Sequence, residues 1–232
     1  MRRFLLSFIA LVLAACAQPS TQATTAALPA CGEDVPTGVL EEGECQIAAG
    51  DETLHVVYAP LPAGVQSGTV TIEVIGADGA VAQTFSEAEV SEYLSPNVED
   101  VDGDSHLDIL VPRESGNANV AQGVWLYDRA AAHYTRVGEI SGVDIQRTSE
   151  GLIAVPARSG AAEWVVSFYK LDATGLHPML SVDVEATDVG DDGRVRNQTC
   201  TIEDAPGLAD LHLTREAAQA KFCAEPAAGV FN

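Results

Sequence analysis

The feature that most constrains the fold of this chain is a series of short segments in which apolar and polar residues alternate. In residues 69–75, Val70, Ile72 and Val74 alternate with polar residues. A period of two places such residues on one face of a β-strand. Similar segments occupy residues 80–85, 107–111, 123–127, 135–140, 152–155, 164–171 and 176–184. We therefore expect mainly antiparallel sheets. No repeat of 20 to 50 residues is clear, so the sequence does not predict a full propeller of many blades.

Turn residues separate several of these segments. Asp78 and Gly79 form a dipeptide that favours a tight hairpin turn between the first two strands. Residues 128–131 begin with Asp128, and residues 172–175 begin with Asp172 and end with Gly175, which favours turns between later strands. The chain therefore has the pattern of consecutive hairpins.

Two segments carry helix signals instead. Ser86 and Glu89 have the spacing of a capping box, which predicts a short helix that must end before Pro96. Near the C-terminus, Thr214 can cap a helix over residues 215–224. The expected fold class is all-β with one or two short helices, the second of them carrying Cys223.

The N-terminus has the features of a bacterial lipoprotein signal. Arg2 and Arg3 precede an apolar run over residues 4–13, followed by Ala14, Ala15 and Cys16. A run of about ten residues is too short for a transmembrane helix, which needs roughly twenty. The alternative interpretation of this apolar run is a buried helix. We expect residues 1–15 to be removed and Cys16 to be lipidated, leaving residues 16–30 as a flexible tether and residues 31–232 as a single domain.

The other four cysteines are expected to form two disulfides. They are Cys31, Cys45, Cys200 and Cys223, an even number in a chain destined for an oxidising compartment. Three connectivities are possible, and we predict Cys31 with Cys45 and Cys200 with Cys223 because each pair closes a local loop. A zinc site is the competing interpretation, although the spacings contain no C-x-x-C pair.

The chain is strongly acidic. Its formal net charge is −22, and loss of Arg2 and Arg3 with the signal peptide lowers it by two more. An acidic surface attracts cations, so nucleic acid is not an expected partner, whereas a basic protein or a divalent cation is. The alternative is that the acidity serves only solubility.

One segment has the composition of a metal site. Residues 100–108 contain four carboxylates, those of Asp100, Asp102, Asp104 and Asp108, and a strand follows directly. These charges repel each other unless a cation joins them. A hard divalent ion with oxygen ligands in flexible geometry, as calcium has, removes that repulsion. We expect calcium to be the cofactor.

The spacing of this calcium loop assigns a role to each position. Side chains at positions one, three, five and nine, those of the four aspartates, would face the ion. His106, at position seven, would contribute its backbone carbonyl. Gly103 permits a backbone conformation that other residues adopt at a cost. An EF-hand requires glutamate at position twelve, where this chain has Val111, so the loop is not an EF-hand.

The pattern D-x-D-G-D-x-x-x-D followed by a hydrophobic residue resembles the calcium loop of FG-GAP and integrin-type β-propeller repeats. It departs from that pattern at Ser105, where the family has a second glycine. Residues 108–134, with Leu126, Tyr127 and Asp128 before a turn, resemble bacterial periplasmic lipoproteins that have a single such loop. That resemblance implies a partial propeller, and for some members an immunity protein against cell-wall hydrolases delivered by type VI secretion, related to lysozyme inhibitors.

A second acidic cluster, at residues 188–193, differs from the calcium loop at two of the positions that would hold ligands. Gly190 stands at position three and Arg196 at position nine. We interpret this cluster as a turn, with a weak metal site as the alternative.

No enzyme motif is complete. Ser167 and Lys170 match S-x-x-K but lie in an alternating segment without a K-T-G, and the histidines show no H-E-x-x-H. We therefore expect a binding protein and no enzyme. The leading hypothesis is an inhibitor or immunity protein that binds a cell-wall hydrolase. By resemblance to lipoprotein sorting signals, Ala17 favours anchoring on the periplasmic side of the outer membrane. A structural or assembly lipoprotein is the alternative.

Overall fold

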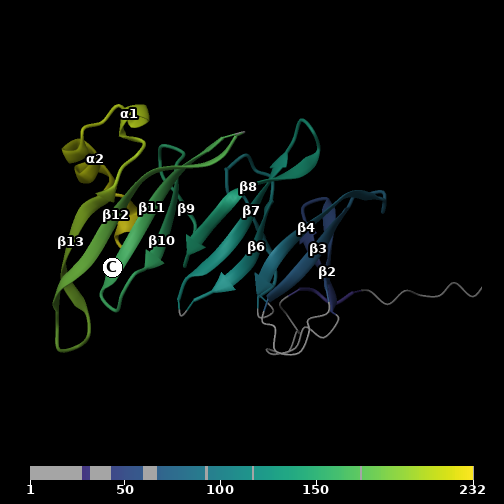
Figure 1. The fold of residues 1–232 in the computed structure, drawn as a ribbon, viewed down its shortest axis with the longest axis horizontal. Coiled ribbons are helices and arrows are strands. Elements are labelled where there is room, and N and C mark those ends of the chain that lie inside the picture. Colours follow the sequence, from purple (N-terminus) through teal and green to yellow (C-terminus); the bar gives the residue numbers. More distant parts are fainter. Residues whose placement is uncertain are drawn as a thin grey trace, which may run out of the picture.

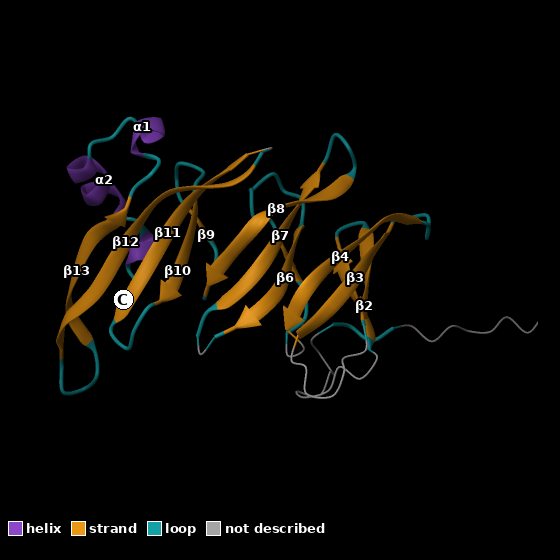
Figure 2. Cartoon of the chain, viewed as in Figure 1, coloured by secondary structure: helices purple, strands orange, loops and turns teal. Residues whose placement is uncertain are grey.

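The computed structural model describes residues 28–31, 43–59, 67–91, 94–116, 118–172 and 174–231. They form three antiparallel sheets, each built from strands that are consecutive in sequence (Figure 1). The sheets follow one another along the chain and lie side by side, with the helices at the C-terminal end (Figure 2). In this described part, no helix is long and apolar enough to cross a membrane.

The first sheet contains β1 (Glu44–Ala49), β2 (Glu52–Tyr58), β3 (Ser67–Ile75) and β4 (Val81–Ser91) in that order. The alternation predicted for β3 is confirmed, since Val70, Ile72 and Val74 are buried. The turn at Asp78 and Gly79 is confirmed as well. Its Asp78 side chain accepts the Ala80 amide at 3.0 Å, and Gly79 has a positive φ of 78°.

The helix predicted from Ser86 and Glu89 is wrong. Both residues lie in β4, which continues to pair with β3 beyond the expected cap. The Ser86 hydroxyl bonds to the Thr71 hydroxyl on the neighbouring strand at 3.1 Å instead of capping a helix. Pairing with β3 therefore overrides the local capping signal, and a register shift in the ladder accommodates the later part of the strand.

The second sheet contains β5 (Asn97–Glu99), β6 (Asp108–Ser115), β7 (Val120–Asp128) and β8 (His133–Gly142). The turn predicted at residues 128–131 joins β7 to β8, and the Asp128 carboxylate accepts the amides of Ala130 and Ala131 at 2.8 and 3.1 Å. The third sheet contains β9 (Gln146–Arg147), β10 (Ile153–Arg158), β11 (Glu163–Asp172), β12 (Gly175–Val189) and β13 (Val195–Asp204), ordered from β13 to β9 across the sheet.

Strand β6 explains how the sheets pack. Ile109 and Val111 belong to a core shared with the first sheet, whereas Leu110 belongs to a core shared with Ile153 and Val155 of the third. The middle sheet is therefore buried on both faces. Residues 107–111 therefore do not alternate as expected, because Ile109, Leu110 and Val111 form a continuous apolar run that is buried on both sides of the strand.

Polar contacts reinforce the packing between sheets. Glu87 of β4 is only 5% exposed, and its carboxylate accepts hydrogen bonds from the Arg136 guanidinium at 2.9 Å and from the Trp125 indole at 3.0 Å, both in the second sheet. Between the second and third sheets, the Val143 amide donates to the Pro156 carbonyl at 2.8 Å. A buried carboxylate must find such partners to offset its lost hydration.

The C-terminal segment covers the third sheet with α1 (Leu208–Leu211), α2 (Arg215–Phe222) and the 3₁₀ turn η1 (Pro226–Ala228). Thr214 caps α2 as predicted, because its hydroxyl accepts the Ala217 amide at 3.2 Å. Phe222 packs against Phe168 of β11 at 4.8 Å between ring centroids. The predicted fold class, mainly antiparallel β with short helices and a disulfide at the C-terminal helix, is confirmed.

Candidate metal centre

The predicted calcium loop joins two neighbouring strands of the middle sheet. Glu99, the last residue of β5, pairs directly with Asp108, the first residue of β6. The ladder between these strands therefore holds both ends of the loop together, and residues 100–107 form the connection. The first and last predicted ligands, Asp100 and Asp108, come close because they stand at this closed end.

Aspartate side chains hold the inside of the loop. The two carboxylate oxygens of Asp100 accept the amides of Gly103 and Ser105 at 2.6 and 3.1 Å. Asp102 accepts the Asp104 amide at 3.0 Å, and Asp104 accepts the His106 amide at 2.7 Å. Each aspartate thus bonds to the backbone two to five residues ahead, which coils the chain around the carboxylates.

Two residues of the loop adopt the left-handed backbone region. Gly103 has φ of 74° and Ser105 has φ of 70°. A non-glycine residue pays roughly 1 to 2 kcal/mol in this region, so Ser105 carries a cost that the glycine of the FG-GAP pattern avoids. A β-carbon at Gly103 would meet the guanidinium of Arg147 from β9, which is the far end of an exposed side chain and can move aside.

Asp108 is the most deeply buried of the four aspartates, at 1% exposure. One carboxylate oxygen accepts the Val101 amide at 2.8 Å and the other accepts the Tyr127 amide at 3.0 Å. Burial raises the pKa of Asp108 to about 6, although these two amides act in the opposite direction. The side chain therefore joins the loop to β7, and its negative charge is buried away from solvent.

The structure brings three of the four predicted carboxylates together. Asp100, Asp102 and Asp108 each offer an oxygen within 4.8 Å of the others. Two oxygens on opposite sides of a calcium ion stand roughly 4.6 to 5.2 Å apart, given bond lengths of about 2.3 to 2.6 Å. In the described residues Asp104 lies outside this group, and its carboxylate is 3.5 Å from the His106 ring. The backbone role assigned to His106 stays a prediction.

The charges around this group favour a cation. Burial raises the pKa of Asp102, and the nearby carboxylates of Asp104 and Asp100 raise it further, while Arg147 lowers it. Burial also raises the pKa of Glu99, helped by Asp144 and Asp100. Such shifts show that the anionic forms are held at a cost, which a divalent cation among hard oxygen donors would offset. The donor set fits calcium.

The second acidic cluster is a hairpin turn between β12 and β13, as predicted. The Gly190 amide donates to the Arg194 carbonyl at 2.8 Å, and the Gly193 amide donates to the Gly190 carbonyl at 2.9 Å. Asp191 and Asp192 are exposed, and Asp192 accepts only the Arg194 amide at 3.2 Å. In the part of the chain that the structure describes, three clustered carboxylates occur only in the loop at residues 100–108.

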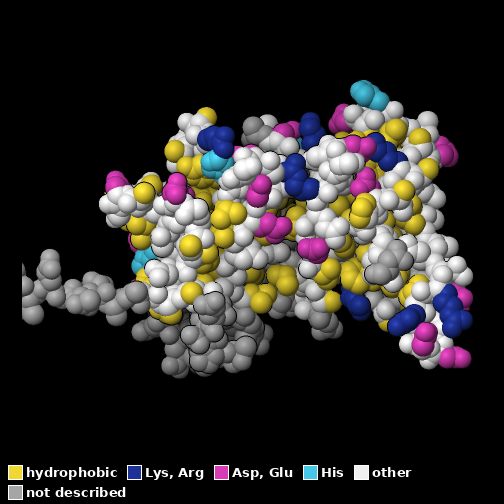
Figure 3. All heavy atoms as spheres, turned by 180° about the vertical axis from the view of Figure 1, so that it is seen from behind, with side chains coloured by type: hydrophobic (Ala, Val, Ile, Leu, Met, Phe, Trp, Pro, Cys, Tyr) yellow, Lys and Arg dark blue, Asp and Glu magenta, His cyan; other side chains and the backbone are white. Residues whose placement is uncertain are grey.

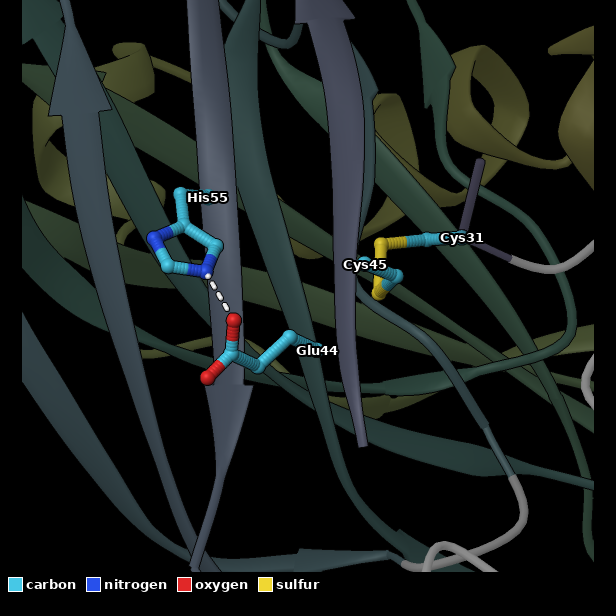
Figure 4. The surroundings of a disulfide bond; sticks show 4 residues. All are labelled: Cys31, Glu44, Cys45 and His55. Carbon is cyan, nitrogen blue, oxygen red and sulfur yellow. Dashed lines mark hydrogen bonds and ion pairs between the residues drawn. A yellow bond between two sulfur atoms is a disulfide. The ribbon is translucent and has the colours of Figure 1, made fainter. Parts of the chain in front are cut away.

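The predicted disulfide pairing is confirmed. Cys31 bonds to Cys45 across 14 residues, and Cys200 bonds to Cys223 across 23 residues. Adjacent side chains of β1 point in different directions: Cys45 meets Cys31, while Glu44 reaches the His55 ring at 3.1 Å (Figure 4). His55 also contacts Glu73 at 2.9 Å, a cross-strand cluster that the sequence did not single out. The predicted lipidation site, Cys16, and the signal peptide lie outside the described residues.

No family model matches the chain, and no curated protein matches it. A solved structure described as a Xanthomonas type IV secretion system related protein is similar at 15% identity and a TM-score of 0.46, covering 72% of this chain and 92% of that one. A similarity at this level carries no argument about function.

Proposed function

We propose that this chain is an exported, lipid-anchored envelope protein whose β-domain binds calcium and, through that domain, binds and inhibits another envelope protein. The observation that carries the proposal is the convergence of Asp100, Asp102 and Asp108 within 4.8 Å in a loop closed by two paired strands. The proposed ion would be held by these three carboxylates, with Asp104 and the His106 carbonyl completing its shell as the spacing predicts.

Calcium would act on stability and not on a reaction. Asp108 is buried, and its carboxylate joins β6 to β7 by accepting the Tyr127 amide. Its negative charge therefore lies in the interior of the folded protein. An ion shared with Asp100 and Asp102 would offset the loss of hydration of these groups. The loop would then hold a single shape on the surface of the middle sheet.

The anchoring part of the proposal rests on the sequence before the domain. Arg2 and Arg3, the apolar run and the small residues before Cys16 form a lipoprotein signal. Two disulfides in the folded part agree with an oxidising compartment. Growth with radiolabelled palmitate tests this directly. Wild-type chain should take up label and Cys16→Ser should not, and an unlabelled wild type would contradict the anchor.

The proposed partner is a peptidoglycan hydrolase, which makes the chain an inhibitor or immunity protein. This part is supported by the resemblance of residues 98–140 to single-loop periplasmic lipoproteins and by the net charge of −22, which would attract a basic enzyme. The alternative of a structural or assembly lipoprotein would bind a partner without changing its activity.

One experiment separates these two possibilities. The chain from Ala17 onward would be immobilised and used to capture proteins from envelope extracts in millimolar calcium and in chelator. Each captured protein would then be assayed for hydrolysis of purified peptidoglycan, with and without added chain. Capture of a hydrolase that the added chain inhibits supports the proposal. Capture of proteins whose activity is unchanged favours the structural role.

A further inference from the structure

A pocket of about 310 Å³ lies next to the calcium loop. The turn between β1 and β2 forms one side, and residues 105–107 of the loop together with the ends of β7 and β8 form the other. It is thus built where the first and second sheets meet at the loop edge. Its volume is at the lower end of the range of small-ligand sites, which suits a single side chain or a small molecule.

The side of the pocket that comes from the first sheet is acidic. Asp51 and Glu52, at the start of β2, both line it. Asp51 is exposed and Glu52 is half-buried. The Tyr134 hydroxyl donates to Glu52 at 3.3 Å, which links this acidic side to the opposite wall.

The side that comes from the second sheet and the loop is aromatic. His106, Tyr127 and Tyr134 line it. The rings of His106 and Tyr127 are nearly parallel at 5.4 Å between centroids, and Tyr134 meets Tyr127 at 5.1 Å with an angle of 61°. Tyr134 is 3% exposed and belongs to the core, whereas the half-buried His106 comes from the calcium loop.

This combination selects for one kind of ligand. Two carboxylates repel anions, and an apolar ligand would leave them without water. A flat cation satisfies both sides, because it can pair with carboxylates in the plane of its N–H groups and rest against aromatic rings. A guanidinium has this shape, and its five donors can reach more than one carboxylate oxygen.

The neighbourhood already contains an example of the contact. Outside the pocket lining, the guanidinium of Arg129 contacts the two ring nitrogens of His106 at 2.8 and 3.2 Å. One ring nitrogen of His106 can therefore accept a guanidinium N–H while the ring lines the pocket. Because Arg129 also brings positive charge, it would weaken binding of a second cation, and the two carboxylates must outweigh it.

The overall charge favours an external cation. The chain has 34 acidic and 12 basic residues. Acidic side chains, with basic ones among them, occur along the length of the face shown in Figure 3, so on this face they are not gathered in one patch. The negative field of such a chain attracts a basic partner, and the shape and charges of a local pocket then determine which group of that partner binds.

We propose that the pocket lined by Asp51, Glu52 and the rings of His106 and Tyr127 accepts an arginine side chain of the protein partner. This inference rests on the proposed function, since it names the group by which that partner is recognised. Ser105, His106 and Leu107 belong both to the pocket and to the calcium loop. An ion that orders the loop would order this wall, so calcium should strengthen binding of the arginine.

The probe for the pocket is acetyl-arginine amide, and acetyl-citrulline amide is its neutral control of nearly the same shape. Titration of both into the chain from Ala17 onward, followed by calorimetry, should show a dissociation constant on the order of 1 mM for the arginine compound. The citrulline compound should bind at least tenfold more weakly. Replacing calcium with chelator should weaken arginine binding several-fold. Equal affinities for the two compounds would overturn the proposal.

Substitutions of the two acidic residues test whether the arginine compound binds in this pocket. Glu52→Gln keeps an acceptor for Tyr134 and removes the charge, so the double variant Asp51→Asn with Glu52→Gln should bind the arginine compound at least fivefold more weakly while melting at the same temperature. Glu185→Gln, an exposed change on β12, is the matched control and should leave the affinity unchanged. An unaltered affinity in the double variant would place the arginine elsewhere and contradict the pocket.

The same measurements keep the pocket and the proposed function apart. If the chain binds calcium and inhibits its hydrolase but does not bind the arginine compound, the pocket inference fails and the proposed function stands. If the arginine compound binds and no hydrolase is inhibited, the pocket stands and the inhibitor role fails.

Discussion

Two acidic turns of this chain have similar sequences and different surroundings. The loop at residues 100–108 closes between paired strands in the middle sheet, and its last aspartate, Asp108, is 1% exposed. The turn at residues 188–193 stands at the tip of a hairpin, where Asp191 and Asp192 face solvent. Clustered carboxylates cost little in water and much when buried. The difference shows that neighbouring strands, more than the number of aspartates, decide whether the carboxylates of an acidic turn are buried.

The largest difference between the two turns should appear on removing an aspartate. Asp108→Ala leaves the amides of Val101 and Tyr127 without an acceptor, so we expect a loss of about 3 kcal/mol in the free energy of unfolding. Asp192→Ala removes one exposed bond and should cost about 0.5 kcal/mol. Urea unfolding of both variants measures this. Equal losses would show that burial of Asp108 does not distinguish the turns.

The buried aspartate should also make stability depend on pH when calcium is chelated. The pKa of Asp108 is raised from 3.8 to about 6 by burial. Between about pH 4 and pH 6 the folded chain keeps this proton and the unfolded chain has lost it. The free energy of unfolding should therefore fall as the pH rises through that window, by up to about 3 kcal/mol, and stay lower above it.

The control for this pH dependence is Asp108→Asn, which cannot titrate. Its unfolding free energy, measured by denaturant titration across the same pH range, should lack the contribution of Asp108. The exposed turn supplies a second control, since Asp191→Asn should leave the wild-type dependence in place. A wild type and an Asp108→Asn variant with parallel pH profiles would contradict the raised pKa.

The next largest difference between the two turns should be their effect on stabilisation by calcium. At a free concentration one hundred times the dissociation constant, an ion bound only by the folded state stabilises it by about 2.7 kcal/mol. Sites in extracellular modules bind in the range of about 10⁻⁴ to 10⁻³ M, so the melting experiments must reach high millimolar calcium. Asp102→Asn should abolish the shift, whereas Asp191→Asn and His106→Ala should leave most of it. An unchanged melting temperature for the wild type would leave only an acidic turn.

The smallest expected difference concerns glycines with the same backbone conformation. Gly103 and Gly193 have φ of 74° and 77°, so alanine at either position costs roughly 1 kcal/mol in backbone strain. A β-carbon at Gly193 meets open space, but at Gly103 it overlaps the Arg147 guanidinium. The guanidinium ends an exposed side chain that can shift, so Gly103→Ala should cost at most about 0.5 kcal/mol more than Gly193→Ala. In urea unfolding, adding Arg147→Ala should recover that excess, and additive losses would exclude the contact.

The strands illustrate which parts of the fold can be predicted locally. Alternation identified β3 because Val70, Ile72 and Val74 all face one core. It missed β13, where Ile202 is the buried hydrophobic residue in a mostly polar edge strand. It also passed over β2, although Leu54, Val56 and Tyr58 alternate and are buried. The sequence of β13 contains no strong strand signal. The sequence of β2 does contain one, because its apolar residues alternate.

The wrong helix has a different cause. Ser86 and Glu89 satisfy a local capping pattern, but the same segment pairs with β3 and carries Glu87 into its contact with Arg136 of the second sheet. A cap contributes about 1 kcal/mol, which a full ladder of strand pairing together with burial exceeds. No local pattern could show this, because the partners of Glu87 lie 38 and 49 residues away.

The amino-acid sequence alone determined the features that depend on near neighbours. The coil of the loop around Asp100, the cap at Thr214 and both disulfides join residues within 23 positions of each other, so spacing and residue type suffice to predict them. Tertiary structure decided that Asp108 is buried, that Arg147 covers Gly103 and that Glu52 bonds to Tyr134 at the pocket between two sheets. These depend on how three separate sheets pack, and burial and electric field arise only when distant segments meet.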